Sequence, residues 1–164
     1  MSTVLTPTVG TPIITAIPSI SNLNTSGYLT AIIDNRTLKA SDFNLIFSGL
    51  MPAVAPANDK CLYIYVIPRI WDGSTWKAGG DFGTAQNIGE TSGSFSFSSP
   101  NNMGSSLMIL NYITSGQGIA GYAKLSSRFG GVMPDGFQFF IVNYTGAALT
   151  AGAILLTPVT FVSL

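Results

Sequence analysis

The chain has 164 residues, enough for one domain with a hydrophobic core, and only 9% of them are charged, against about 25% in an average soluble domain. Its seven basic residues balance seven acidic ones and form no cluster, so we expect no nucleic-acid partner. No stretch approaches the roughly 18 apolar residues of a membrane span, and the first residues lack the pattern of a signal peptide. The sequence therefore predicts synthesis in the cytoplasm and no membrane partner.

The first 26 residues differ in composition from the rest of the chain. They are rich in Ser, Thr and Pro, carry no charge, and contain isolated Val, Leu and Ile residues. Such a segment is too apolar for a disordered tail and has too many prolines for a central strand. We predict an extended arm over residues 1–26 that lies on its own domain or on a neighbouring subunit, and a domain over 27–164; an ordinary edge strand is the alternative. The arm residues expected to make contacts are Val4, Leu5, Ile13, Ile14 and Ile17.

The first half of the domain has a β pattern. A short apolar run covers 28–33, and the alternation of Phe43, Leu45 and Phe47 predicts a second strand, although Ile46 interrupts its polar side. Residues 61–71 form the strongest predicted strand, apolar on both faces as in a buried central strand, with Pro68 expected to mark its end or a bulge. Asp72-Gly73 then predicts a hairpin turn.

The second half of the domain continues this pattern. Residues 78–91 are rich in Gly and predict a surface loop, and strands are predicted at 94–98, 107–113, 137–144 and 154–164. Apolar residues between 119 and 129 recur at intervals of three and four, which predicts a short helix or an irregular crossing. The many short strands separated by Gly, Pro and Asn predict an all-β fold, a jelly-roll-like antiparallel β-sandwich with an extended N-terminal arm.

Catalytic chemistry finds little support in this composition. The chain has no histidine, so the commonest general base and metal ligand is absent. The few carboxylates lie mostly in predicted turns, where hydrogen bonding to the backbone accounts for them. Asp72, Asp81 and Glu90 share one region, but their spacing matches no EF-hand. We expect no enzyme, no metal site and no cofactor.

Aromatic residues near the predicted hairpin are candidates for contacts with a partner. Trp71 and Trp76 flank the turn, and such a pair can stack on a sugar ring, although it more often fills a core or an interface. We predict that the loop carrying Trp71, Trp76 and Phe82 contributes to the rim of an interface.

Three phrases of the sequence stand out together: Asp72-Gly73, the stretch FGGVMP at 129–134 and the stretch NYTGAAL at 143–149. With these phrases, residues 59–161 resemble a family of small virion proteins of tailed bacteriophages. The resemblance implies a jelly-roll decoration (cement) protein on the outer surface of the virion capsid. Such a protein would bind the major capsid protein, form a homodimer or homotrimer, and stabilise the head by bridging capsomers. The alternative is a virion-surface or tail-associated module that binds a carbohydrate or receptor.

Overall fold

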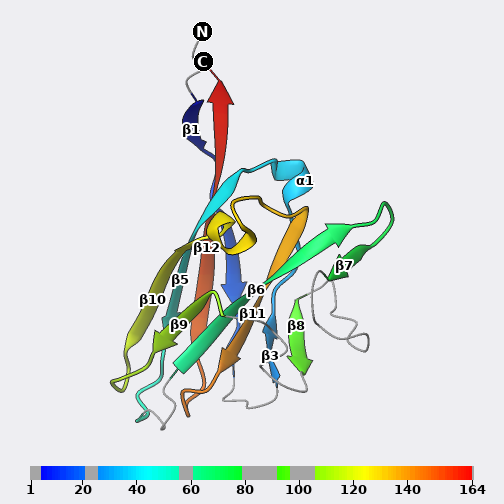
Figure 1. The fold of residues 1–164 in the computed structure, drawn as a ribbon. Coiled ribbons are helices and arrows are strands. Elements are labelled where there is room, and N and C mark those ends of the chain that lie inside the picture. The colour runs from blue at the N-terminus through cyan, green and yellow to red at the C-terminus, as the bar shows by residue number, and fades with distance from the viewer. Residues whose placement is uncertain (1–4, 21–25, 56–60, 79–91, 97–105, 164) are drawn as a thin grey trace.

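The computed structural model describes residues 5–20, 26–55, 61–78, 92–96 and 106–163 of the chain. These residues form an all-β protein in which two antiparallel sheets pack against each other (Figure 1). The helical content of these residues is small: α1 at Asn35–Leu38 and a 3-10 helix at Ser126–Phe129.

The first sheet is built around the C-terminal strand. Its hydrogen-bonded order is β1-β12-β5-β10, and β2 also pairs with β12. The bounds are β1 Leu5–Val9, β2 Ile13–Ile17, β5 Asp42–Leu50, β10 Gly118–Lys124 and β12 Ala151–Ser163.

The second sheet has the order β7-β6-β11-β3-β8, with β4 also paired to β11 and β9 to β6. Its bounds are β3 Ser26–Leu29, β4 Ile33–Asp34, β6 Cys61–Trp71, β7 Trp76–Ala78, β8 Gly93–Ser96, β9 Met108–Asn111 and β11 Gly136–Asn143. Every residue of β11 is buried, which explains why its sequence is apolar and aromatic on both faces.

The main core lies between the two sheets. The alternating residues Phe43, Leu45 and Phe47 of β5 are fully buried there, as predicted, and Ile46 points to the opposite face. Phe137 and Phe139 of β11 meet them from the other sheet, and the ring of Phe43 packs edge-on against Phe137 with centroids 5.1 Å apart. A smaller cluster of apolar residues covers the other face of the second sheet: Leu29, Tyr65, Ile67, Phe140 and Val142.

The strand predicted at 61–71 is confirmed, and it continues through Pro68 to Trp71 without a bulge. Ile64 directs its carbonyl toward the β9 side, where it accepts the N–H of Leu107, so even-numbered residues of β6 have their backbone groups on that side. The missing N–H of Pro68 thus falls between β9, which pairs up to Ile64, and β7, which pairs from Arg69. A proline is tolerated there because the described residues require no ladder hydrogen bond from it.

The helical interpretation of residues 119–129 is wrong over most of its length. Residues 118–124 form strand β10, and the single turn of 3-10 helix begins only at Ser126. Ile119 is buried while Tyr122 is exposed, because the two residues lie on opposite faces of a strand instead of on one stripe of a helix. The apolar residues spaced three apart therefore belong to two opposite faces of the strand.

The described residues of the predicted N-terminal arm, 5–20, form the strands β1 and β2, and its residues 1–4 and 21–25 lie outside the described residues. β2 pairs with β12 from Ile13 to Ile17, and Ile17 and Ile20 are buried in the main core. Among the described N-terminal residues, β1 extends beyond the sandwich together with the last residues of β12, with which it pairs (Figure 1).

Candidate interaction surface

A β-bulge separates the two N-terminal strands that pair with β12. Val9 is paired with Val159 and the N–H of Gly10 donates to the carbonyl of Pro158, whereas Ile13 is paired with Leu156. Residues 11 and 12 therefore both lie opposite residue 157, which is one residue more than a regular ladder contains. The extra residue reverses the alternation, so that odd-numbered residues of β1 and even-numbered residues of β2 face the same side.

The outer face of the first sheet carries a row of apolar side chains that crosses four strands. Leu155 of β12 is paired with Ile14 of β2 and with Ile46 of β5, and Ile46 is paired with Tyr122 of β10. Ile14, Ile46 and Tyr122 are exposed to solvent. We call these four residues the apolar row: Ile14, Leu155, Ile46 and Tyr122.

The sheet surface around the apolar row carries little charge. The next row across the sheet consists of Ala16, Ala153, Ser48 and Ala120. The charged residues with outward register, Asp42 and Lys124, lie at the ends of their strands. Apolar side chains lie close together at directly paired positions of neighbouring strands. The described part of this face therefore presents a contiguous apolar strip to solvent.

A depression of about 290 Å³ lies near the ends of β5 and β12 on this sheet. It is open to solvent and lined by small residues and backbone: Ser48, Gly49, Leu50, Ala151, Gly152 and Ala153. A small-molecule site normally encloses its ligand and offers converging polar side chains. The depression has neither property, so this face is better suited to contact another protein than to bind a small ligand.

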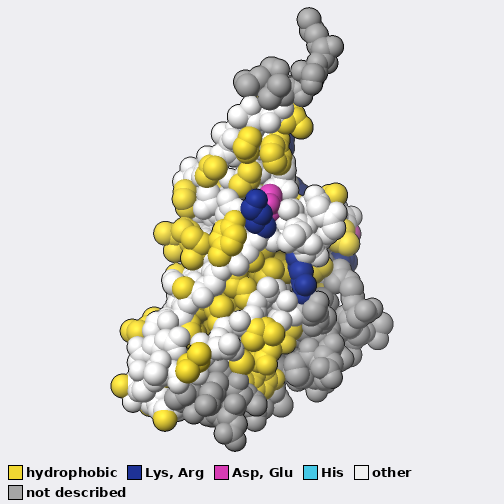
Figure 2. Space-filling view, turned by 60° about the vertical axis from the view of Figure 1, so that its left-hand side comes forward, with side chains coloured by type: hydrophobic (Ala, Val, Ile, Leu, Met, Phe, Trp, Pro, Cys, Tyr) yellow, Lys and Arg dark blue, Asp and Glu magenta, His cyan; other side chains and the backbone are white. Residues whose placement is uncertain are grey.

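Beyond the sandwich, β1 and the end of β12 form a two-stranded ribbon of Leu5–Val9 paired with Val159–Ser163. One face of the ribbon carries the apolar residues Leu5, Pro7, Val9, Val159 and Phe161, and the other carries mainly threonine. Leu5, Val9 and Phe161 are 61%, 64% and 52% exposed. Figure 2 shows hydrophobic side chains over the ribbon and the body below it, with only isolated charged side chains among them. Because β12 is continuous, the apolar face of the ribbon extends the outer face of the first sheet.

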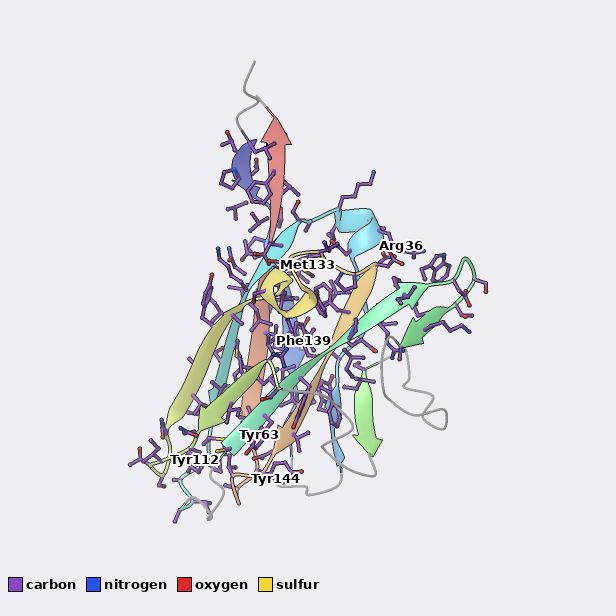
Figure 3. The ribbon with its side chains drawn as sticks, in the orientation of Figure 1. Arg36, Tyr63, Tyr112, Met133, Phe139 and Tyr144 are labelled. Carbon is purple, nitrogen blue, oxygen red and sulfur yellow. The ribbon has the colours of Figure 1, made fainter. Side chains whose placement is uncertain are left out.

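The two tryptophans form a separate cluster at the β6–β7 hairpin. Their ring centroids lie 5.3 Å apart in an edge-on arrangement, and the guanidinium carbon of Arg36 lies 4.1 Å from the Trp71 ring and 4.6 Å from the Trp76 ring. Figure 3 shows Arg36 extending from α1 toward this hairpin. Trp76 also packs over Gly136, where a Cβ atom would come within 2.8 Å of its ring.

Hydrogen bonds hold this cluster in place. Arg36 donates from Nε and Nη2 to the two carboxylate oxygens of Asp34, at 3.0 and 2.7 Å, and this contact lowers the pKa of Asp34. In the hairpin turn the Asp72 carboxylate accepts the backbone N–H groups of Thr75 and Ser74 at 2.8 and 2.9 Å, and these bonds hold the pKa of Asp72 well below its ordinary value. The Trp pair is therefore a packed hairpin base in which Arg36 covers one face of each indole.

The structure separates the predicted contact residues into different environments. Leu5 lies on the ribbon and Ile14 in the apolar row, both exposed, whereas Ile13 is partly buried against the core. The prediction that Ile17 is a surface contact is wrong, because its side chain is only 2% exposed in the core. Trp71 and Trp76 are half-buried at the hairpin, on the second sheet. Val4, Phe82, Asp81 and Glu90 lie outside the described residues.

Sequence reasoning missed Ile46, Tyr122, Leu155 and Phe161 as surface residues of the first sheet. Ile46 interrupts the polar side of its strand in the sequence, and this interruption is the local signal that an apolar residue faces outward. The other three are brought to the same surface by strand register, which no local pattern reveals.

The described residues contain no group of three or more His, Cys, Asp or Glu side chains that could hold a metal ion. None of the helices in these residues is long and apolar enough to cross a membrane. The described carboxylates have structural partners: Asp42 accepts the N–H of Ser126, and Asp135 accepts the N–H of Trp71.

These features define the chain as an all-β protein of two antiparallel sheets, one of which presents a largely apolar face and a projecting ribbon. No family model, curated protein or solved structure matches the chain.

Proposed function

We propose that the protein is a non-enzymatic structural subunit that docks onto a larger assembly through the outer face of its first sheet. The observation that carries the proposal is the apolar row, with small uncharged residues in the row on one side of it. A stable monomer seldom leaves a contiguous apolar surface in water, and larger patches of this kind mark interaction sites. Only 9% of the residues of the whole chain are charged, which also favours a protein whose surface is in contact with partners.

The assembly that fits best is the head of a tailed bacteriophage, where the protein would be a decoration (cement) protein with a jelly-roll fold. The support is the resemblance of residues 59–161 to that family, together with the roles of the shared phrases. Gly130 and Gly131 have φ values of 68° and 91°, which glycine adopts readily. Asn143 is buried and hydrogen-bonded to Thr145 within the stretch 143–149. The stretches 129–134 and 143–149 both serve the fold, as expected in a family of structural proteins.

In this proposal the partner is an uncharged, partly apolar surface of the major capsid protein. Long-range attraction plays a small part in the contact, because the outward charges of this face, Asp42 and Lys124, are few and opposite in sign. Burial of Ile14, Ile46 and Tyr122 would supply the main stabilisation, and Tyr122 offers a hydroxyl that already donates to Asn44 at 2.9 Å. Bridging of neighbouring capsomers follows if two or more copies act together.

The test is to quantify the protein on purified particles and to challenge these particles with heat. A copy number in the hundreds, with shells that burst more readily once the protein is lost, supports a cement role. A few copies per particle, or intact heads after its loss, contradicts that role and favours a tail or receptor-binding part.

A pair of matched variants tests the docking face itself. Ile46→Asp places a charge in the apolar row and is expected to abolish particle binding, whereas Val132→Asp adds the same charge at an exposed loop residue and is expected to leave binding unchanged. Equal thermal midpoints for both variants establish that folding is intact. Full binding by Ile46→Asp would contradict the proposed face.

A further inference from the structure

Strand β12 extends beyond the end of β5, its neighbour on one side. Its pairing with β5 ends at Val159, opposite Asp42, whereas its pairing with β1 continues to Ser163. From Thr160 onward, one edge of β12 therefore has no neighbouring strand among the described residues. Such an edge presents backbone donors and acceptors to any strand that can reach it.

The backbone groups on this edge follow from the alternation of the ladder. The carbonyl of Val159 accepts the N–H of Ser41 at 2.8 Å, on the β5 side. Two residues further along the strand, the N–H and C=O of Phe161 point to the same side, beyond the end of β5. The neighbouring Thr160 has its backbone groups on the β1 side, opposite Thr8. The open edge is thus centred on Phe161.

The other edge of the ribbon is protected by a proline. The N–H of Gly10 donates to Pro158 at 2.8 Å, so even-numbered residues of β1 direct their backbone groups to β12 and odd-numbered ones direct them outward. Pro7 is odd-numbered and has no N–H to offer on that outer edge. Proline on an edge strand prevents further pairing. One edge of the ribbon is therefore blocked, and the other is open.

We propose that the open β12 edges of two copies pair antiparallel about a two-fold axis near Phe161, giving a four-stranded sheet in the order β1, β12, β12 of the second copy, β1 of the second copy. A two-fold contact places each side chain near its own counterpart, so a charged ribbon would repel itself. Neither Leu5–Val9 nor Val159–Ser163 contains a charged residue, and neither contains a lysine that would discourage such pairing.

The occupant is a second copy because the ribbon alone is incomplete. Two strands are marginally stable in water, whereas three or more with an apolar face are stable. An axis perpendicular to the new sheet keeps the apolar faces of both ribbons on one side. Leu5, Val9 and Phe161 of both copies then form one surface that continues onto both outer faces. The inference rests on the proposed function, because the role of the dimer would be to present two docking faces together.

The test is sedimentation equilibrium of the purified full-length protein, without particles, from low micromolar to several hundred micromolar. We expect a monomer–dimer equilibrium. Phe161→Pro removes the N–H on the open edge, leaves the β1 ladder intact, and is expected to weaken dimerisation at least tenfold. The matched variant Leu5→Pro removes an N–H from the outer edge of β1 and is expected to leave the dimer unchanged. Thermal unfolding of each variant confirms that it is folded.

Cross-linking supplies a second measurement that does not depend on proline. In a Cys61→Ser background, cysteine at Phe161 or at Val162 is expected to give a disulfide-linked dimer at one of the two positions, because paired Cα atoms near the axis lie about 4.5–5.5 Å apart. Leu5→Cys is expected to give none. A monomeric wild-type protein, or a Phe161→Pro variant that still dimerises fully, overturns the inference. Dimers that fail to bind particles instead contradict the proposed function alone.

Discussion

The side-chain amide of Asn143 donates a hydrogen bond of 3.0 Å to the backbone carbonyl of Ile20, and so ties the end of β11 to the segment that follows β2. The same amide donates to Ala147 at 2.7 Å, and its oxygen accepts from the N–H and hydroxyl of Thr145. One buried side chain thus joins the second sheet to the N-terminal segment of the first.

Asn143→Ala is expected to lower the free energy of unfolding by about 2–3 kcal/mol, because it leaves buried backbone and hydroxyl groups with fewer partners. Urea unfolding measures the change. Asn111→Ala is the matched control, since Asn111 is exposed and its amide oxygen accepts only from the thiol of Cys61, so a change within about 0.5 kcal/mol is expected. Equal effects of the two substitutions would contradict the role given to Asn143.

Gly130→Ala is expected to cost about 1–2 kcal/mol of stability, because the residue ends the 3-10 helix at a φ of 68° in the left-handed region. No atom lies within 4 Å of the position that a Cβ would take, so the cost is conformational only. Gly118→Ala in β10 meets the same open space without a positive φ. Chemical denaturation is therefore expected to find that Gly118→Ala is neutral or slightly stabilising, and a matching loss there would refute the argument.

Arg36→Gln is expected to increase the accessibility of the tryptophans, because the guanidinium covers one face of both rings. Acrylamide quenching of tryptophan fluorescence measures this directly. Asp34→Asn weakens the ion pair but keeps the guanidinium, so a smaller increase is expected. If sugar binding appears only in Arg36→Gln, Arg36 blocks an aromatic platform. Sugar binding by the wild-type protein would instead favour the carbohydrate-binding alternative.

Asp72 is expected to make stability depend on acid pH. Its pKa is lowered in the folded protein, mainly by the N–H groups of Thr75 and Ser74, so the unfolded chain binds more protons as the pH falls below about 4. The stabilisation is present above that pH and is lost below it. Urea midpoints between pH 5 and pH 2 are expected to fall more steeply for wild type than for Asp72→Asn. Ser74→Ala retains both backbone donors and removes only the weaker hydrogen bond from the Ser74 hydroxyl, so its slope should stay close to that of wild type. Identical slopes for wild type and Asp72→Asn would disprove the assignment.

The central strands were predictable because burial on both faces demands continuous apolar residues. Residues 61–71 and 137–144 match β6 and β11 closely, and the Asp72-Gly73 turn lies where its sequence placed it. β10 was not predictable in the same way. Its small residues Gly118, Ala120 and Gly121 have weak strand preference, and pairing with β5 overrides it.

The interaction surface was only partly predictable, since it depends on register. Leu5 and Ile14 were identified as exposed apolar residues, but Ile17 belongs to the core, and the extra residue at 11–12 decides which alternate residues face out. The apolar row joins residues from positions 14 to 155, and the pairing of β12 with β2 and β5 and of β5 with β10 brings them together. The Trp pair was visible in the sequence, whereas its cover, Arg36, comes from a distant helix.

The pairing of Leu5 with Ser163 places the two ends of the described chain side by side, one strand spacing of about 4.8 Å apart. A short linker could therefore join them, and the chain could be reopened in another loop, such as the one at residues 112–117. The circularly permuted protein would keep the same sheets, with the ribbon converted into a closed hairpin.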